Sequence, residues 1–352
     1  MKTLKLSIGI DVAKDTIVCC KGTLDTEGLI CFSKSRTFFN NPEGFEELMG
    51  WTKVDPGIEI LFVMEATGVY YEGLAYWLDA KDKKISVLLP GKVKHYGKSL
   101  NVKTKTDGVD AQLLSRMGLE RRLDSWHMPS KAMRTIKFLS REYKEIKAKL
   151  VVSKNQLHAK THSHGCPASV TKRLNQEIGL LETQLLEIEA ELRMTAMADT
   201  ALYDRINKIT TLPGVGFITV IGVLAETNAF ALVKNAKQLV SYAGLDIKLN
   251  QSGAKEGKTR ISKQGNSFIR SALYMPALCA SRHNRELNRF YNRLNERKPA
   301  KKIGITAVAR KLLVLIYTLW KNNEEFNPDI TKENRQAGLR LPAQDEQVVL
   351  LK

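Results

Sequence analysis

The pattern of apolar and polar positions over the first 120 residues predicts alternating strands and helices. Short apolar runs bounded by turn residues are typical of β-strands, and they occur at 4–10, 16–21, 29–37, 58–64 and 85–89. Short turns containing Asp15 or Gly22 separate the first three runs, so we expect these strands to pair antiparallel. The run at 58–64 is almost continuously apolar, as expected of a strand buried on both faces.

Helices are predicted between and after these strands. Asn41-Pro42-Glu43 marks a helix start with Pro42 at the first helical position, and this helix runs to about residue 52. Residues 71–79 form a second helix, and 106–116 form a third after a basic loop. This order of elements is that of an RNase H-like (RuvC-like) α/β fold, although other α/β domains share parts of it.

Residues 133–194 have a different pattern, in which apolar residues lie alternately three and four positions apart. This spacing predicts two helices with a coiled-coil seam, interrupted at Gly165 and Pro167. The helices could fold back as an antiparallel hairpin or pair with another subunit. Ordinary amphipathic helices on a core are the alternative.

Residues 206–330 are predicted to form a mostly helical domain. The turn Leu212-Pro213-Gly214-Val215-Gly216 opens an apolar helix at 218–226. Such a helix-hairpin-helix-like turn presents backbone N–H groups to a phosphate, unless it is only a tight turn. A buried helix is expected at 307–320. We therefore predict domains at 1–125 (RNase H-like), 126–200 (coiled-coil connector) and 201–330 (mostly α), with a polar tail at 331–352.

The charge of the chain indicates which class of partner it binds. There are 55 Lys and Arg residues against 37 Asp and Glu, a formal net charge of +18. Such a surplus attracts a polyanion, because each neutralised phosphate releases condensed counterions. We predict a nucleic-acid partner; a merely solvated basic surface is the alternative.

Membrane insertion and secretion are not indicated. No apolar run approaches the roughly 18–20 residues that span a bilayer, and the N-terminus leads directly into a strand pattern. The five cysteines show no paired spacing and read as reduced thiols. We expect a cytoplasmic protein without a membrane partner.

Four carboxylates suggest a metal site. Asp11 ends the first strand and Glu65 ends the fourth, and these two strands are neighbours in the predicted sheet. Asp107 and Asp110 are three positions apart and so share one helix face. Four crowded acids repel one another unless a cation lies among them, and hard oxygen ligands suit Mg²⁺ or Mn²⁺. The alternative is that Asp107 is a helix cap and Asp11 a turn residue.

Two further clusters are candidates for binding. Basic residues near the acids and in a glycine-containing stretch of the last domain could hold phosphates, or could be solvated loops: Lys103, Lys105, Lys258, Arg260, Lys263 and Arg270. His158, His162, His164 and Cys166 could bind zinc, but they lack a second well-spaced pair. A polar hairpin tip is the simpler interpretation.

A series of different short motifs follows along nearly the whole chain, to about Phe326. They include Gly9-Ile10-Asp11-Val12-Ala13-Lys14, Glu65-Ala66-Thr67-Gly68, Lys105-Thr106-Asp107-Gly108-Val109-Asp110-Ala111, Leu212-Pro213-Gly214-Val215-Gly216, Ser241-Tyr242-Ala243-Gly244-Leu245, Ser252-Gly253, Ile261-Ser262-Lys263-Gln264-Gly265-Asn266 and Ala309-Arg310-Lys311. In number and order these motifs resemble the DEDD-type transposases of insertion sequences, a family that includes the Piv invertase and the bridge-RNA-guided recombinases.

The resemblance implies specific roles for residues. The metal-binding set would be Asp11, Glu65, Asp107 and Asp110, and the nucleophile would be Ser241. By position alone Ser241 is unremarkable, since Ser252, Ser262, Ser267 and Ser271 compete with it. A guide (bridge) RNA is expected from the resemblance only, because no RNA-recognition motif is visible.

The expected activity is that of a transposase or site-specific recombinase acting on donor and target DNA. Strands would exchange by Mg²⁺-dependent transesterification through a 5′-phosphoserine. The acids and Ser241 lie in different predicted domains, so we expect a dimer or tetramer that completes the site between subunits. The alternative is that the helical hairpin folds both domains of one chain together. Two alternatives stay open. One is an RNase H-like nuclease or Holliday-junction resolvase that uses water, and the other is a non-catalytic nucleic-acid-binding protein.

Overall fold

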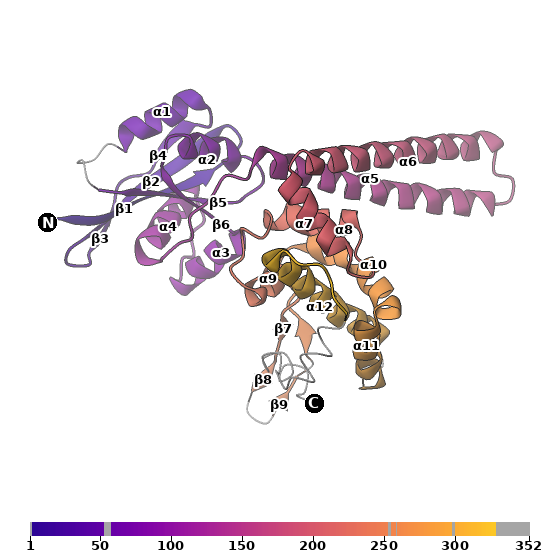
Figure 1. The fold of residues 1–352 in the computed structure, drawn as a ribbon. Helices are drawn as coiled ribbons and strands as arrows, with labels where there is room; N and C mark the ends of the chain where they lie inside the picture. The colour runs from indigo at the N-terminus through magenta and orange to yellow at the C-terminus, as the bar shows by residue number, and fades with distance from the viewer. Residues whose placement is uncertain (1, 53–57, 253–254, 258, 298–299, 329–352) are drawn as a thin grey trace. The chain divides into compact units, whose positions relative to one another are not determined.

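The computed structural model describes residues 2–52, 58–252, 255–257, 259–297 and 300–328 (Figure 1). The chain divides into two compact units, Met1–Met128 and Pro129–Lys352. The predicted tail at 331–352 and the predicted phosphate contact Lys258 lie outside the described residues. We refer to the two parts as unit 1 and unit 2.

Unit 1 is built on one mixed sheet. Its strands are β1 (Thr3–Val12), β2 (Thr16–Asp25), β3 (Ile30–Phe32), β4 (Arg36–Phe39), β5 (Ile60–Glu65) and β6 (Lys84–Leu88). The spatial order is β3-β2-β1-β5-β6, with β4 also paired to β2. The strands β1 and β2 are antiparallel, whereas β1, β5 and β6 run parallel. The prediction of a mixed α/β sheet at the N-terminus is confirmed.

The third predicted strand is in fact two strands. The run at 29–37 is interrupted at Ser33-Lys34-Ser35, and the two short strands β3 and β4 on either side each pair antiparallel with β2. The exposed polar triplet has no apolar residue to bury against the sheet, so the chain leaves the ladder there and rejoins it.

Four helices accompany the sheet: α1 (Pro42–Trp51), α2 (Tyr71–Asp79), α3 (Pro90–Ser99) and α4 (Asp107–Glu120). At the start of α1, Asn41 Oδ1 accepts a hydrogen bond from the Gly44 N–H at 2.9 Å, and Pro42 stands at the first position as predicted. The sequence pattern missed α3, because its glycines and lysines resemble a basic loop. Its buried residues Val93 and Tyr96 nevertheless pack in the core with Leu113 and Leu114 of α4.

Unit 2 begins with two long helices, α5 (Lys131–Thr161) and α6 (Ala168–Met197), which pack as an antiparallel hairpin (Figure 1). Apolar residues of both helices belong to the core of unit 2, including Ile136 and Leu139 of α5 and Ile178 and Leu181 of α6. Of the two arrangements left open by the sequence, the structure has the hairpin within one chain. Coiled-coil geometry itself stays a prediction.

The rest of unit 2 is mostly helical, as predicted. Its helices are α7 (Thr200–Thr210), α8 (Phe217–Thr227), α9 (Ala236–Tyr242), α10 (Ser267–His283), α11 (Arg285–Arg297) and α12 (Lys301–Asn322). Two small antiparallel ribbons lie between α9 and α10. They consist of β7 (Ile247–Lys248) with β10 (Arg260–Ile261), and β8 (Gln251–Ser252) with β9 (Lys255–Glu256). The turn before α8 contains Gly214 at φ +90°, a conformation that favours glycine.

Helix α12 corrects one expectation from the sequence. By length and composition alone, α12 could cross a membrane, because its most apolar window of 18 residues holds at most two charged residues. Half of its most apolar window is buried inside the structure. Residues such as Val308, Leu312 and Ile316 belong to the core of unit 2, and a buried core helix passes the same test.

Candidate active site

Asp11 and Glu65 lie side by side at one end of the sheet. In the parallel pairing of β1 with β5, Ile10 is opposite Met64, so the next residue on each strand is one of these acids. Both side chains are partly exposed. Thr67, just beyond β5, donates its hydroxyl to Glu65 Oε1 at 2.7 Å. The predicted convergence of the two strand ends is therefore present.

Asp107 and Asp110 are placed by the start of α4. Thr106 caps this helix, since its hydroxyl oxygen accepts from the Val109 N–H at 3.3 Å. Both acids stand in the first turn of the helix, where the N–H groups and the helix dipole favour negative charge. The capping role that we considered for Asp107 belongs to Thr106.

Gly9 brings α4 close to β1. A Cβ atom at this position would lie 2.0 Å from the Ala111 carbonyl oxygen and 2.2 Å from the Ser115 nitrogen. The helix backbone therefore rests directly on the strand, two residues before Asp11. The Ser115 hydroxyl fixes this contact by donating to the Ser7 carbonyl at 2.9 Å. The glycine of the first motif thus has a packing reason that helps to bring the acids together.

The four acids act on one another electrostatically. The pKa of Asp11 is raised from 3.8 to about 6, chiefly by burial and then by the negative charges of Asp107, Asp110 and Glu65; a backbone hydrogen bond from Val12 opposes the rise. An excess of negative charge is therefore concentrated around Asp11. A hard divalent cation fits this donor set, because it would relieve the repulsion with the oxygen ligands that it prefers.

The four acids are not arranged as a preformed metal site in the described part of the chain. Among the residues that the structure describes, no three His, Cys, Asp or Glu side chains are grouped closely enough to hold a metal ion. The predicted lysines near them, Lys103 and Lys105, are exposed in the segment that leads into α4. The arrangement is thus four neighbouring carboxylates beside an exposed basic segment.

Ser241, in unit 2, stands in the last turn of α9 with an exposed side chain. Within the described ranges, its hydroxyl has no hydrogen-bonding partner. The neighbouring Tyr242 differs in both respects. Its phenol is largely buried and donates to the Glu226 carbonyl at 2.9 Å, and burial raises its pKa. Of these adjacent hydroxyls, the serine is the accessible one.

A turn after the small ribbons wraps the C-terminus of α9. The Asn266 N–H donates to the Tyr242 carbonyl at 2.7 Å, and the Lys263 N–H donates to the Gly244 carbonyl at 3.1 Å. At Gly265 a Cβ atom would lie 2.4 Å from the Tyr242 oxygen, so only glycine allows this approach. The motif Ser262-Lys263-Gln264-Gly265-Asn266 therefore holds the Ser241 helix in place.

The structure distinguishes the predicted phosphate contacts of this region. Arg260 and Lys263 are exposed. Arg270 is half-buried instead, and its Nη1 donates to the carbonyls of Ala243 at 2.8 Å and Gly265 at 3.1 Å. Its guanidinium therefore caps the backbone behind Ser241, a structural task that the sequence did not indicate.

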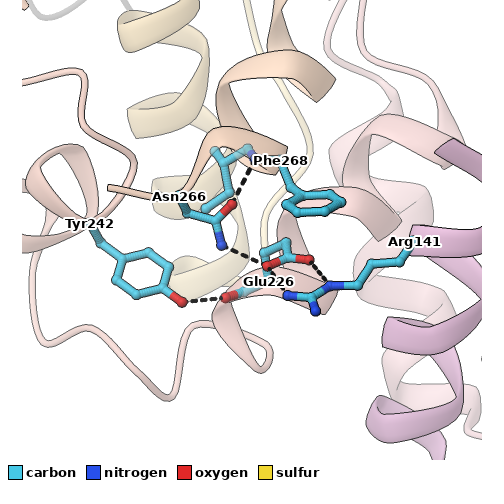
Figure 2. Close-up of polar contacts among 6 residues, drawn as sticks. Arg141, Glu226, Tyr242, Asn266 and Phe268 are labelled. Atoms are coloured by element: carbon cyan, nitrogen blue, oxygen red, sulfur yellow. Dashed lines mark hydrogen bonds and ion pairs between the residues drawn. The ribbon is translucent and has the colours of Figure 1, made fainter. Parts of the chain in front are cut away.

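The sequence did not lead us to Glu226, the acidic residue of the apolar helix α8. Its side chain is buried and bonds to Arg141 and Asn266, while Tyr242 bonds to its carbonyl (Figure 2). A lone carboxylate in an apolar helix is a signal that could have been used, because such a charge is rarely buried without partners.

The histidines at the tip of the α5–α6 hairpin form no metal cluster with Cys166 among the described residues. The rings of His158 and His162 stack with centroids 4.3 Å apart, and His162 Nδ1 lies 2.7 Å from the His158 carbonyl oxygen. These local contacts match the simpler prediction of a polar hairpin tip.

Comparisons with known proteins point to one family. Residues 8–162 match a family model of DEDD transposases of the IS110 type, and residues 206–292 match the model of the transposase IS116/IS110/IS902 family. Pilin gene-inverting proteins of Moraxella lacunata and Moraxella bovis are 30% and 29% identical over 330 residues, which cover 93% of this chain and 99% of each relative. The transposase for insertion sequence element IS1111A of Coxiella burnetii is 30% identical over 121 residues, 32% of each chain.

Proposed function

Because this chain belongs to the IS110 family of insertion-sequence transposases, we propose that it cuts and rejoins DNA by metal-dependent transesterification with Ser241 as nucleophile. The observation that carries this proposal is that Asp11 and Glu65 follow paired residues of β1 and β5 at one end of the mixed sheet, where the charges of Glu65, Asp107 and Asp110 also raise the pKa of Asp11. All four acids lie within the part of the chain that the first family model matches, and the negative charge near Asp11 supports a role in binding a cation.

The four carboxylates would hold Mg²⁺ or Mn²⁺. When bound, such an ion supplies positive charge that stabilises the attacked phosphate and the leaving oxygen. The chain's own part is to keep the acids together. Gly9 and the Ser115–Ser7 bond bring α4 to β1, and Thr106 fixes the first turn that carries Asp107 and Asp110.

Ser241 would carry out the covalent step. Its Oγ attacks a DNA phosphorus and loses its proton, a 5′-phosphoserine bond forms, and the bond to the 3′ oxygen breaks. The 3′ oxygen leaves with a proton as a 3′-hydroxyl. A 3′-hydroxyl of another strand then attacks the phosphoserine and releases the serine, so strands are rejoined without an external energy source. The exposure of Ser241 supports this role, because DNA must reach it.

DNA is the expected substrate, and the basic residues offer contacts to it. Lys103, Lys105, Arg260 and Lys263 are exposed and suited to phosphates, while Arg270 would act by holding the backbone near Ser241. A bridge RNA as guide and assembly as a dimer or tetramer complete the proposal. The inverting relatives, named for gene inversion, support a reaction in which cut ends are rejoined.

The test is the capture of the covalent intermediate. The protein is incubated with DNA of its own element, RNA transcribed from that element and Mg²⁺, and protein–DNA adducts are resolved under denaturing conditions. We expect an adduct that maps to Ser241 and is absent from Ser241→Ala. Ser271→Ala, which removes another exposed serine of unit 2, is the matched control and should keep the adduct. DNA cleavage by Ser241→Ala at the normal rate would instead indicate a nuclease or resolvase that uses water.

A further inference from the structure

Glu226 is a buried carboxylate at the end of α8, with only 4% of its surface exposed. Burying an ionised carboxylate is costly unless it is paired and hydrogen-bonded. The side-chain oxygens of Glu226 accept hydrogen bonds from Arg141 and Asn266, which come from two different segments of unit 2 (Figure 2). The identity of these donors shows what the carboxylate connects.

The first donor comes from the long hairpin. Arg141 of α5 contacts both oxygens of Glu226, with Nε 2.8 Å from Oε1 and an Nη 3.1 Å from Oε2. A two-point contact fixes orientation as well as distance. Burial would raise the pKa of Glu226, but the hydrogen bonds from Arg141 and Asn266 and the charges of Arg141 and Lys137 lower it, so the carboxylate is ionised.

The second donor comes from the turn behind Ser241. Asn266 Nδ2 lies 2.6 Å from Glu226 Oε2. The same residue caps α10, where its Oδ1 accepts from the Phe268 and Ile269 N–H groups, and its own N–H donates to the Tyr242 carbonyl. Asn266 therefore ties α8, α9 and α10 together at one point.

The third contact connects Glu226 directly to α9. The Tyr242 hydroxyl donates to the main-chain carbonyl of Glu226 at 2.9 Å. Because Tyr242 directly follows Ser241, the serine's helix is held to Glu226 from both sides, by Tyr242 and by Asn266. No part of this cluster was singled out by the motifs of the metal site.

We propose that Glu226 is a positioning residue that fixes the Ser241 helix α9 to the connector helix α5 through Asn266 and Arg141. The inference rests on the function proposed above and adds to it a residue that holds the proposed nucleophile in position. Ser241 reaches a phosphate only in a defined direction, and a displacement of about 1 Å can cost up to about 100-fold in rate. A polar cluster with three directional links restricts such displacement better than apolar packing of the short, seven-residue helix alone.

The test exchanges the two members of the Glu226–Asn266 pair. In Asn266→Asp the cap on α10 is kept, since aspartate also accepts from N–H groups, but the donor to Glu226 is lost and two carboxylates face each other. The double variant Asn266→Asp with Glu226→Gln restores one amide and one carboxylate in reversed positions, although its new amide nitrogen no longer accepts the bond from Arg141 that Oε2 accepts. Glu189→Gln, which removes a salt bridge with Arg193 on α6, is the matched control.

Three quantities are measured on the full-length protein. The first is the rate of adduct formation at saturating DNA, the second is DNA affinity, and the third is hydrogen exchange of the α9 amides. For Asn266→Asp we expect about a tenfold lower rate at saturating DNA, unchanged affinity and faster exchange in α9. The reversed pair should return the rate to within about threefold of the unmodified protein and slow the exchange again. The control should change none of the three.

The outcomes separate this inference from the proposed function. An unchanged adduct rate and unchanged α9 exchange in Asn266→Asp would overturn the positioning role. So would a lower adduct rate with unchanged α9 exchange, because a displaced α9 would then not be the cause of the loss. If the unmodified protein formed no serine adduct, the proposed nucleophile would be wrong, while the exchange of α9 would still decide whether Glu226 and Asn266 hold that helix.

Discussion

Asp11 in unit 1 and Glu226 in unit 2 are both carboxylates removed in part from water, yet their surroundings have opposite effects. Around Asp11 the neighbours are further acids, and the pKa rises to about 6. Around Glu226 the neighbours are an arginine and an amide donor, and the pKa is lowered. The charges of the first cluster are not balanced by the chain, and under the proposed function a cation from outside would balance them. The second is satisfied by the chain itself and serves to hold other groups.

This contrast separates the parts of a site that bind from the parts that position. An unbalanced cluster loses its task when one acid is removed, but the fold loses nothing. A balanced cluster loses structure when one partner is removed, because the other stays buried without compensation. The following predictions use that difference.

The largest effect is expected from Asp11→Ala or Asp107→Ala. Removing one acid should lower DNA cleavage by roughly a thousandfold or more, since a bound cation contributes several kcal/mol of charge stabilisation. Thermal unfolding should not shift downward, because like-charge repulsion is relieved. Cleavage assays and unfolding curves of the same preparations check both statements. Near-normal recombination by Asp11→Ala would remove this acid from the metal set.

The second prediction concerns the division of the site between the two units. The acids lie in unit 1 and Ser241 lies in unit 2, whereas the proposed reaction requires both to act on one phosphate. If partner chains supply the two halves, mixing Asp11→Ala with Ser241→Ala should restore part of the cleavage that each lacks alone. Mixed oligomers are verified with two different tags. Their formation without any return of cleavage would show that each chain builds its site alone.

A smaller effect is expected from the packing that brings the acids together. Gly9→Ala would place a methyl group against the backbone of α4, and overpacking of this kind costs about 1–3 kcal/mol. Gly73→Ala in α2 is the control, because a Cβ atom there meets open space and alanine favours a helix. Urea unfolding followed by tryptophan fluorescence suits this test, since Trp51, Trp77 and Trp126 all lie in unit 1. Equal stability of the two variants would contradict the close contact.

The same contrast explains how much the sequence could predict. The strands that carry Asp11 and Glu65 were predictable because the apolar content of their residues indicates buried strands, and a helical spacing of three placed Asp107 and Asp110 on one helix face. The division of the run at 29–37 and the helix α3 were missed, since short polar or glycine-rich segments carry little periodic signal. The Glu226 cluster was missed for a different reason. Its members come from positions 141, 226, 242 and 266, and pairing between such distant polar residues is decided by tertiary packing.

Ser241, the proposed nucleophile, shows a similar limit of sequence-based prediction. The motif around Ser241 identified the residue only through family resemblance, because an exposed serine in a helix has no distinguishing pattern. The role of Arg270 was predicted as phosphate binding, since a basic residue near glycines commonly has that role. In the structure, Nη1 of its guanidinium donates to two backbone carbonyls, whose positions depend on how the turn folds, so the sequence could not predict these bonds.

The smallest predicted effect is a pH-dependent change of stability in Asp11→Asn. Because the folded-state pKa of Asp11 is raised from 3.8 to about 6, the folded state binds the proton more tightly than the unfolded chain does. The favourable contribution of the protonated acid is complete below about pH 4 and is lost as the pH rises through about 6. An uncharged asparagine avoids that loss. We therefore expect Asp11→Asn to match the unmodified protein at pH 4 and to exceed its stability above pH 6.

The magnitude follows from the same shift. Each pKa unit corresponds to about 1.4 kcal/mol, but the site is half exposed and solvent screens the charges, so we expect a gain of only about 1–2 kcal/mol at pH 7.

Glu226→Gln should lower the stability at pH 7, the opposite of Asp11→Asn. A carboxyl group whose pKa is lowered in the folded state contributes stability above its unfolded-state pKa, and this contribution is lost on acidification. Unfolding curves at pH 4 and pH 7 without divalent cations compare the two variants. Adding Mg²⁺ at pH 7 should then stabilise the unmodified protein more than Asp11→Asn, because only the former keeps the full acidic set. A destabilised Asp11→Asn at pH 7 without the cation would show that its charge is already compensated within the chain, as that of Glu226 is.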